Sequence, residues 1–199
     1  ASKYTGEAAS MPASAALAHR DGRPVVYIQA NIHAGEVEGK EALLMFLRDL
    51  AVGRRREWLR SAIFLVTPIF NADGNDRMSP DNRSYMPNPE KGVGVRQNTQ
   101  NLDLNRDYVK TESREVRAVL EKVVLTWDPL VYVDLHTTDG SYHRETVTWT
   151  SPQGPNVDPA VSGFVWDRLF PSLDGVLQAQ GIHPLPYGDF VDDTQPEKG

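Results

Sequence analysis

Short apolar runs alternate along the chain with segments whose apolar residues recur at helical spacing. The runs predict buried strands at residues 25–28, 63–66, 130–133 and, more briefly, 147–149. Apolar positions three and four apart predict helices at residues 36–50, 112–125 and 160–180. This alternation predicts an α/β fold with a mixed, mainly parallel sheet flanked by helices. No linker divides the chain, so we expect a single domain over 1–199.

One long stretch breaks the alternation. Residues 70–104 are polar and carry Gly, Asn, Asp and Pro throughout, with no sustained apolar period. A loop of this length inside a compact chain usually serves a function or is disordered. The pattern leaves both possibilities, a functional loop and a disordered one, open.

Composition narrows the kind of site. The chain of 199 residues has 27 acidic and 21 basic side chains, a net charge of -6, and no cysteine. This balance gives no general attraction to nucleic acid, and no apolar run is long enough for a membrane-spanning segment. A metal site would have to use His, Asp or Glu.

Two of the predicted strands are followed by a histidine. His33 follows the first run and His136 the third, and parallel strands present their carboxyl ends at the edge of the sheet where ligands bind. Glu36, three residues after His33, can reach the same point. The His33–Glu36 pair alone is also typical of a hydrogen-bonded strand end with an acid at a helix start. Because His136 adds a third convergent ligand, the pattern predicts one zinc per chain, held by His33, Glu36 and His136.

The segment 101–107 carries a second signal. Asn105 and Arg106 stand side by side, and together they can hydrogen-bond and charge-pair a carboxylate. Arg96 adds a second guanidinium nearby. Taken alone, the segment could equally be a solvated loop with ordinary surface charges.

Taken together, the motifs resemble the zinc carboxypeptidases of the carboxypeptidase A type, over roughly residues 24–140. The resemblance rests on four motifs in the family's order: His33-Ala34-Gly35-Glu36, Asn71-Ala72-Asp73-Gly74, Asp103-Leu104-Asn105-Arg106 and Asp134-Leu135-His136. It implies the family's three-layer α/β/α fold. It also implies that His33, Glu36 and His136 are the zinc ligands.

The same resemblance implies roles for the polar loop. Asp103 matches the acid that holds the first ligand histidine, and ligand histidines usually donate their other N–H in this way. Asn105 and Arg106 match the pair that grips the terminal carboxylate of the substrate. Arg96 matches the arginine that polarises the scissile carbonyl and stabilises the oxyanion, with Arg83 as its competitor.

A glutamate acting as general base is also implied, on a late strand beyond the third ligand. After His136 the chain has only Glu145, which is too close, and Glu197, which lies in a polar tail. We therefore expect a truncated catalytic domain with the base beyond Gly199, and a chain that is inactive or very slow. Glu197 is the less favoured alternative.

The function implied by the resemblance is that of a zinc metallocarboxypeptidase. It would hydrolyse the C-terminal residue of peptides with a metal-activated water. Two alternatives stay open: a zinc deacylase of N-acyl amino acids, similar to aspartoacylase or succinylglutamate desuccinylase, and a non-catalytic metal-binding domain. The family is often secreted or periplasmic, and the sequence itself does not identify the compartment.

Overall fold

The computed structural model describes residues 13–84, 89–137, 145–152 and 154–187. The chain divides into two compact units, residues 1–138 and 139–199. The single domain expected over 1–199 stays a prediction. Among the described residues, no helix combines the length and apolarity needed to cross a membrane.

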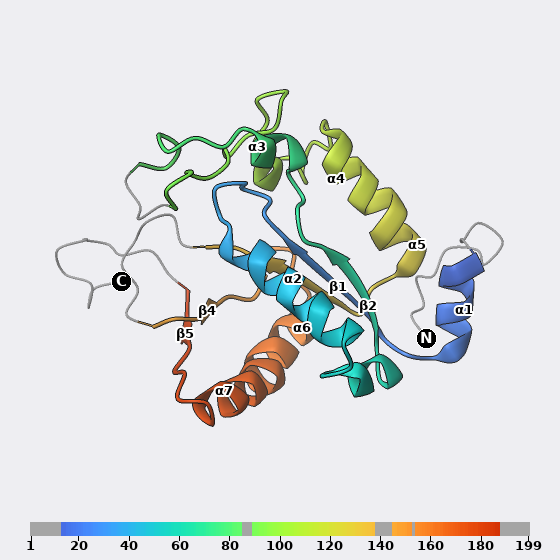
Figure 1. Ribbon diagram of the computed structural model, residues 1–199. Helices are drawn as coiled ribbons and strands as arrows, with labels where there is room; N and C mark the ends of the chain where they lie inside the picture. Colours follow the sequence, from blue (N-terminus) through green and yellow to red (C-terminus); the bar gives the residue numbers. More distant parts are fainter. Residues whose placement is uncertain (1–12, 85–88, 138–144, 153, 188–199) are drawn as a thin grey trace. The chain divides into compact units, whose positions relative to one another are not determined.

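A parallel sheet forms the centre of the first unit (Figure 1). Its strands are β1 (Val25–Ala30), β2 (Ile63–Thr67) and β3 (Val131–Leu135), in the order β2-β1-β3. Both pairings are parallel, with Val26 opposite Phe64 on one side and opposite Val131 on the other. The predicted strands are confirmed. The chain moves from β1 to one neighbour and then back across to the other, so the order reverses at β1.

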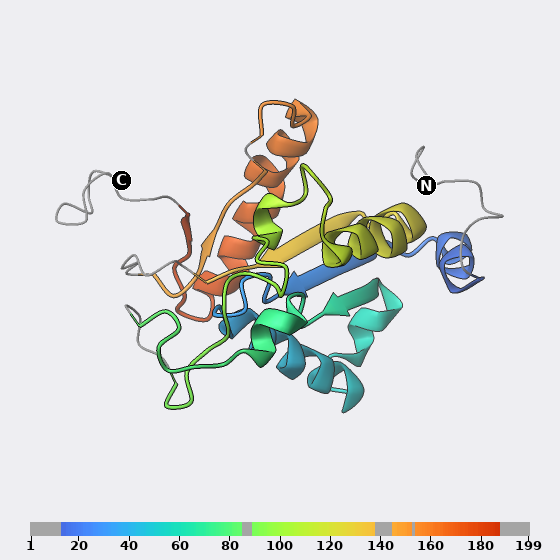
Figure 2. The ribbon, with the colours of Figure 1, turned by 90° about the horizontal axis from the view of Figure 1, so that it is seen from above.

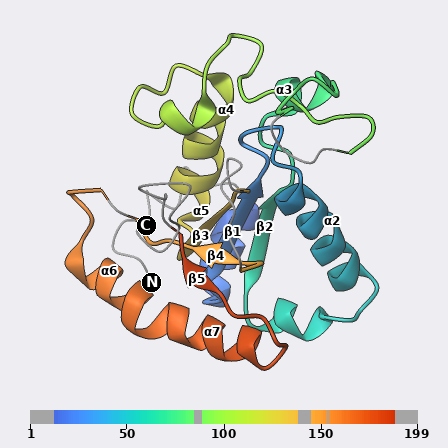
Figure 3. The ribbon, with the colours of Figure 1, turned by 90° about the vertical axis from the view of Figure 1, so that its left-hand side faces the viewer.

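The connecting helices cover opposite faces of this sheet (Figures 2 and 3). Helix α2 (Glu38–Ala51) joins β1 to β2 on one face. The other face carries one continuous helix built from α4 (Arg114–Val119), the π-helical turn η4 (Leu120–Val124) and α5 (Leu125–Trp127). Right-handed crossovers in opposite directions place helices on opposite faces in this way. The described part thus has the layered α/β arrangement that the sequence predicts.

The core lies between the sheet and the α4 helix. Tyr27 of β1 faces the helix, and Val116 and Val119 of α4 complete the contact with three loop residues. The cluster of buried side chains is Tyr27, Ile32, Phe70, Leu104, Val116 and Val119. Three of these residues lie outside the strands and the α4 helix. Ile32 follows β1, Phe70 follows β2, and Leu104 ends the polar stretch 70–104. The core therefore anchors the segments that carry the candidate site.

On the opposite face, α2 packs closely against the sheet. A Cβ at Gly39 would lie 2.8 Å from Leu135 Cβ and 3.1 Å from Ala30 Cβ, so only glycine allows this approach. Further along the helix, Phe46 meets Phe64 of β2 edge to face at 5.3 Å. The close contact at Gly39 fixes the start of α2 against the carboxyl ends of β1 and β3.

The polar stretch 70–104 contains more order than its sequence suggests. It begins with the short helix α3 (Ala72–Asp76), whose first turn is capped by Asn71, and an isolated bridge pairs Ser79 with Val93. The 3-10 turn η3 (Leu104–Arg106) begins at the last residue of the stretch. Two other elements of this unit are the helix α1 (Ala13–Asp21) and the 3-10 helix η2 (Arg56–Arg60).

The second unit is a small parallel pair of strands and a long helix. Strand β4 (Thr148–Trp149) pairs with β5 (Leu185–Pro186). The predicted helix over 160–180 runs as three consecutive segments: α6 (Pro159–Phe164), the π-helical turn η5 (Val165–Leu169) and α7 (Phe170–Gln178). Trp149 stacks on Phe170 with ring centroids 3.6 Å apart. This aromatic contact ties the strand to the helix.

Candidate metal centre

Two neighbouring strands deliver the two histidines predicted as ligands. Ala30 at the end of β1 lies opposite Leu135 at the end of β3. Both strands end at this register, and His33 and His136 lie side by side with ring centroids 5.2 Å apart. This is the carboxyl edge of the sheet, next to the strand where the order reverses, and ligands of open α/β sheets bind there.

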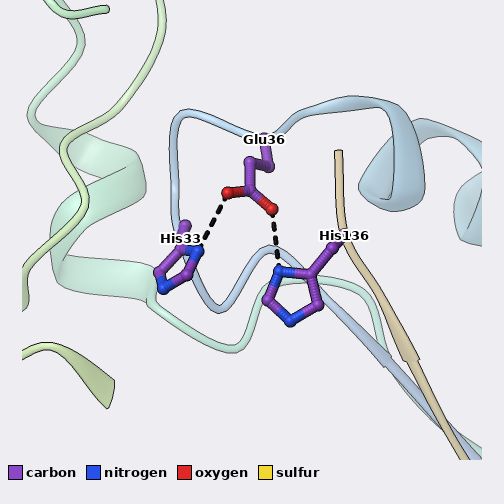
Figure 4. Close-up of side chains that lie close together, drawn as sticks. All are labelled: His33, Glu36 and His136. Carbon is purple, nitrogen blue, oxygen red and sulfur yellow. Dashed lines mark hydrogen bonds and ion pairs between the residues drawn. The ribbon is translucent and has the colours of Figure 1, made fainter. Parts of the chain in front are cut away.

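Glu36 lies between the two imidazoles (Figure 4). Its Oε1 is 2.9 Å from His33 Nδ1, and its Oε2 is 2.9 Å from His136 Nδ1. One ligand atom from each of the three residues lies within 4.8 Å of the others. His33 and Glu36 are buried, whereas 33% of the His136 side chain is exposed. The structure thus brings together the three residues that the sequence predicts as zinc ligands.

A short turn sets the spacing of His33 and Glu36. The Glu36 N–H donates to His33 O at 2.9 Å, which folds the four residues back on themselves. Asn31, just before the turn, has a left-handed backbone with φ 63° and donates its side-chain amide to Ala34 O and Glu36 O. Asparagine tolerates this conformation better than most residues. Asn31 therefore shapes the turn that presents both side chains.

The outer nitrogen of each histidine meets an aspartate. His33 Nε2 lies 3.1 Å from Asp103 Oδ1, and His136 Nε2 lies 3.2 Å from Asp134 Oδ2. When Nε2 carries the proton and donates it to the aspartate, Nδ1 keeps its lone pair. In that tautomer both lone pairs face the Glu36 carboxylate, and a metal cation can lie between them; in the absence of a metal, protonated Nδ1 atoms can donate to the carboxylate instead.

These contacts test whether the residues fit zinc. Zinc accepts imidazole nitrogen and carboxylate oxygen, and catalytic zinc takes three protein ligands. Here three such ligands converge, and each imidazole is oriented by a carboxylate on its far side, which is the usual outer partner of a ligand histidine. The donor set and its surroundings fit zinc.

The electrostatics of this cluster favour a charged carboxylate. Burial would raise the pKa of Glu36, but hydrogen bonds to His136 and His33 outweigh it and hold that pKa far below its usual range. Burial would likewise lower the pKa of His136, but the hydrogen bonds to Asp134 and Glu36 raise it to about 9. Glu36 is therefore a carboxylate at neutral pH, ready to balance positive charge.

Two arginines from the polar loop reach the cluster by different routes. Arg96 donates from Nε to Asp103 Oδ2 at 2.8 Å, and its Nη1 lies 3.3 Å from His33 Nδ1. Arg83 donates from Nη2 to Glu36 Oε1 at 3.3 Å, with only 11% of its side chain exposed. Arg96 therefore lies at the first histidine and Arg83 at the carboxylate.

The predicted carboxylate-binding pair lies one step further out. The Asn105 N–H donates to Asp103 Oδ1 at 3.0 Å, so the acid that contacts His33 also holds this turn. Arg106 is exposed, and its Nη1 donates to Asn105 O at 3.0 Å. The Asn105–Arg106 turn is thus tied to the candidate metal ligands through Asp103. Glu197, the alternative base, lies outside the described residues.

Three residues that organise the site were not predicted as site residues from the sequence. Asp134 stands in one of the four motifs, and its position two residues before His136 on the same strand could have indicated the contact. Asn31 gives no signal beyond its place after β1. Asn71 is fully buried and donates to both Ile32 O and Arg96 O, at 3.3 and 3.0 Å. It joins the turn after β1 to the segment of Arg96.

Comparison with known proteins agrees with this geometry. The sequence profile of the zinc carboxypeptidase family matches residues 5–143. The chain belongs to the zinc carboxypeptidase family. Its members are zinc-dependent metallopeptidases, which makes the cluster of His33, Glu36 and His136 the candidate zinc site.

Individual relatives match only in part. Human carboxypeptidase D is 28% identical over 116 residues, covering 50% of this chain and 8% of that protein. Among solved structures, a protein from Shewanella denitrificans has a TM-score of 0.54 at 22% identity, covering 86% of this chain and 42% of that one. A metallo-carboxypeptidase from Burkholderia cenocepacia has a TM-score of 0.53 at 19% identity, covering 96% and 45%. The two structures share the fold, and the chain spans less than half the length of each protein compared.

Proposed function

We propose that this chain carries the zinc-binding and carboxylate-binding part of a metallocarboxypeptidase, which removes the C-terminal residue of peptides. One observation carries the proposal: both Nδ1 atoms face the Glu36 carboxylate, while both Nε2 atoms face aspartates. Zinc bound by His33, Glu36 and His136 would polarise a carbonyl and make a water molecule nucleophilic at neutral pH.

Asp103 and Asp134 hold the proton positions that this chemistry requires. Each accepts the Nε2 proton of one histidine and so keeps the Nδ1 lone pair directed at the cluster. Asp103 does more, because it also pairs with Arg96 and holds the Asn105 backbone. We assign Asp103 as the residue that fixes three groups relative to one another. These are the ligand His33, the proposed oxyanion donor Arg96, and the Asn105–Arg106 turn that would bind the substrate.

Arg96 is the proposed oxyanion donor. Its Nε is held by Asp103, and its Nη1 already lies beside the first histidine. A guanidinium carries five N–H donors in a fixed plane, so one edge can be held while another donates to a carbonyl oxygen as charge develops on it. Arg83 fits this role less well, because its guanidinium contacts the carboxylate ligand instead.

Asn105 and Arg106 are the proposed grip on the terminal carboxylate of the substrate. Arg106 is exposed, so its planar fork can be reached by a peptide end. A charge-assisted contact of this kind contributes about 1.5–3 kcal/mol. That corresponds to roughly 10- to 150-fold in affinity for a free acid over its amide.

Calorimetry with a short peptide and its C-terminal amide tests this proposal. Zinc-loaded wild type should prefer the acid by roughly 10- to 150-fold, and Arg106→Lys should lose most of that preference because an ammonium cannot form the bidentate pair. The exposed Arg117, on the outside of α4, provides a matched control as Arg117→Lys. Equal affinity of wild type for acid and amide would remove the carboxypeptidase interpretation and favour the deacylase or a non-catalytic metal site.

A further inference from the structure

Within the described part of the chain, four polar neighbours of two kinds contact the Glu36 carboxylate. His33 and His136 approach one oxygen each through Nδ1, the atoms that the proposed zinc would use. Arg83 Nη2 lies 3.3 Å from Oε1, and the Thr137 N–H donates to Oε2 at 3.0 Å. The last two donors are not proposed ligands. They can therefore hold the carboxylate in place without occupying the position of the metal between the two histidines.

Arg83 reaches Glu36 only because residue 35 is glycine. A Cβ at Gly35 would lie 2.5 Å from Arg83 Cδ and 3.2 Å from Arg83 Cγ, closer than packed carbon atoms approach. The nearest backbone atom to that Cβ would be Gly94 O, at 3.2 Å, a much milder conflict. The arginine side chain therefore passes over the glycine that directly precedes the carboxylate it contacts.

The backbone of Arg83 is also committed to this position. Its φ is 52°, in the left-handed region that non-glycine residues rarely adopt. Only 11% of the Arg83 side chain and 4% of the Glu36 side chain are exposed. A strained backbone, a glycine that gives room and a buried guanidinium–carboxylate contact all lead to the same pairing.

We infer that Arg83 is a positioning residue for the carboxylate ligand Glu36, and that Gly35 gives it the room to act. This inference rests on the proposed zinc site. Arg83 fixes the rotamer of Glu36 and balances its buried charge, so that the carboxylate is oriented before a metal binds. Partners of ligating groups typically contribute 10- to 100-fold to metal affinity. A guanidinium also repels a divalent ion, so we expect a net contribution at the lower end, roughly 10-fold.

A double-mutant cycle measures the pairing. Zinc dissociation constants, determined by competition with a chelator, should rise roughly 10-fold in Arg83→Met and by a similar factor in Gly35→Ala. The methyl group added by Gly35→Ala would displace the arginine side chain, so the double variant should bind zinc no more weakly than either single variant. The absorption spectra of the cobalt-substituted variants should also change in the same way.

Two control variants isolate the effect. Arg117→Met removes an exposed charge from α4, and Gly175→Ala adds a methyl group where no atom lies within 4 Å. Both should bind zinc like wild type. Unchanged or tighter zinc binding in Arg83→Met, or additive losses in the double variant, would overturn the inference. If wild type itself bound no zinc, the proposed function would fail instead, so the two failures are distinguishable.

Discussion

The two strand ends that form the candidate zinc site are built differently. The turn after β1 supplies His33 and Glu36, whose side chains are 5% and 4% exposed. The end of β3 supplies His136, which is 33% exposed. One half of the site is thus part of the protein interior, and the other half lies at its surface.

The contacts that support the two strand ends also differ. Side-chain amides hold the backbone of the β1 turn: Asn31 binds Ala34 O and Glu36 O, and Asn71 binds Ile32 O. At the β3 end, His136 contacts Asp134 of the same strand, and the Thr137 N–H donates to Glu36 Oε2. If the proposed function holds, the β1 turn contributes to folding as well as to metal binding, whereas His136 contributes mainly to metal binding. Equivalent changes at the two ends should therefore lower stability by different amounts.

Zinc affinity should change most when either ligand histidine is removed. His136→Ala leaves two of three ligands, so the loss should exceed the 10- to 100-fold typical of an outer partner. In the presence of a chelator, His136→Ala should lower the unfolding temperature, because it removes a hydrogen-bonded partner of the buried Glu36 carboxylate, but by less than His33→Ala since His136 is partly exposed. His33→Ala should lose zinc equally and also unfold at a lower temperature. Equal unfolding temperatures for the two variants would show that the two ends do not differ in this way.

Stability should respond most strongly at the β1 turn. Asn31→Ala removes the donor to two carbonyls and places alanine at φ 63°, so we expect a loss of about 2–3 kcal/mol in the free energy of unfolding. Asp134→Ala, at the β3 end, should cost less than about 1 kcal/mol because its ion pair is part-exposed. Urea unfolding of both variants measures the contrast, and a smaller loss in Asn31→Ala than in Asp134→Ala would contradict it.

The two orienting aspartates differ less. Asp103→Asn should keep the fold and weaken zinc binding by roughly 10- to 100-fold, because Asp103 holds Arg96 as well as His33. Asp134→Asn should lie near the lower limit, about 10-fold, because Asp134 contacts the more exposed histidine. Titration with zinc in a chelator buffer gives both constants. An unchanged constant for Asp103→Asn would make it an ordinary loop acid.

A smaller loss of stability is expected at Asp107, which lies at neither of the two strand ends. It is buried and accepts from the Glu112 and Ser113 N–H groups at 2.9 and 2.8 Å. Burial would raise its pKa, but hydrogen bonds from Ser113 and the backbone outweigh that and lower it. A lowered folded pKa stabilises the chain above the unfolded value, about 4, and this stabilisation is lost as the pH falls further.

Asp107→Asn should therefore destabilise the chain by about 1 kcal/mol at pH 7. The difference from wild type should shrink as the pH falls below about 4. Urea unfolding at several pH values checks the trend. A difference that stayed constant down to about pH 3 would show that the carboxylate charge is not the source of the effect.

The sequence predicts the sheet well because its strands are continuous apolar runs, and parallel strands bring the residues after them to one edge. For that reason the proximity of His33 and His136 could be predicted from the sequence alone. Helix α3 escaped prediction because its residues, rich in Asn, Asp and Gly, have no apolar period. Its stability comes from the Asn71 cap and from packing.

The supporting contacts could not be predicted, for a different reason. Arg83 meets Glu36 across 47 residues, and its path depends on the missing Cβ of Gly35. Asn71 joins two loops 39 and 25 residues away. Such contacts follow from how loops fold over one another, which local patterns do not encode. Asp134 is the exception, since alternation along β3 already places it on the side of His136.

Both the proposed function and the role of Arg83 require that His33, Glu36 and His136 hold one zinc through both Nδ1 atoms. Anomalous diffraction at the zinc edge, from crystals grown with one equivalent of zinc, locates the ion without further assumptions. We expect one peak, about 2.0–2.1 Å from each Nδ1 and within bonding distance of the Glu36 carboxylate. A peak bound through Nε2, or placed away from this cluster, would contradict the assignment.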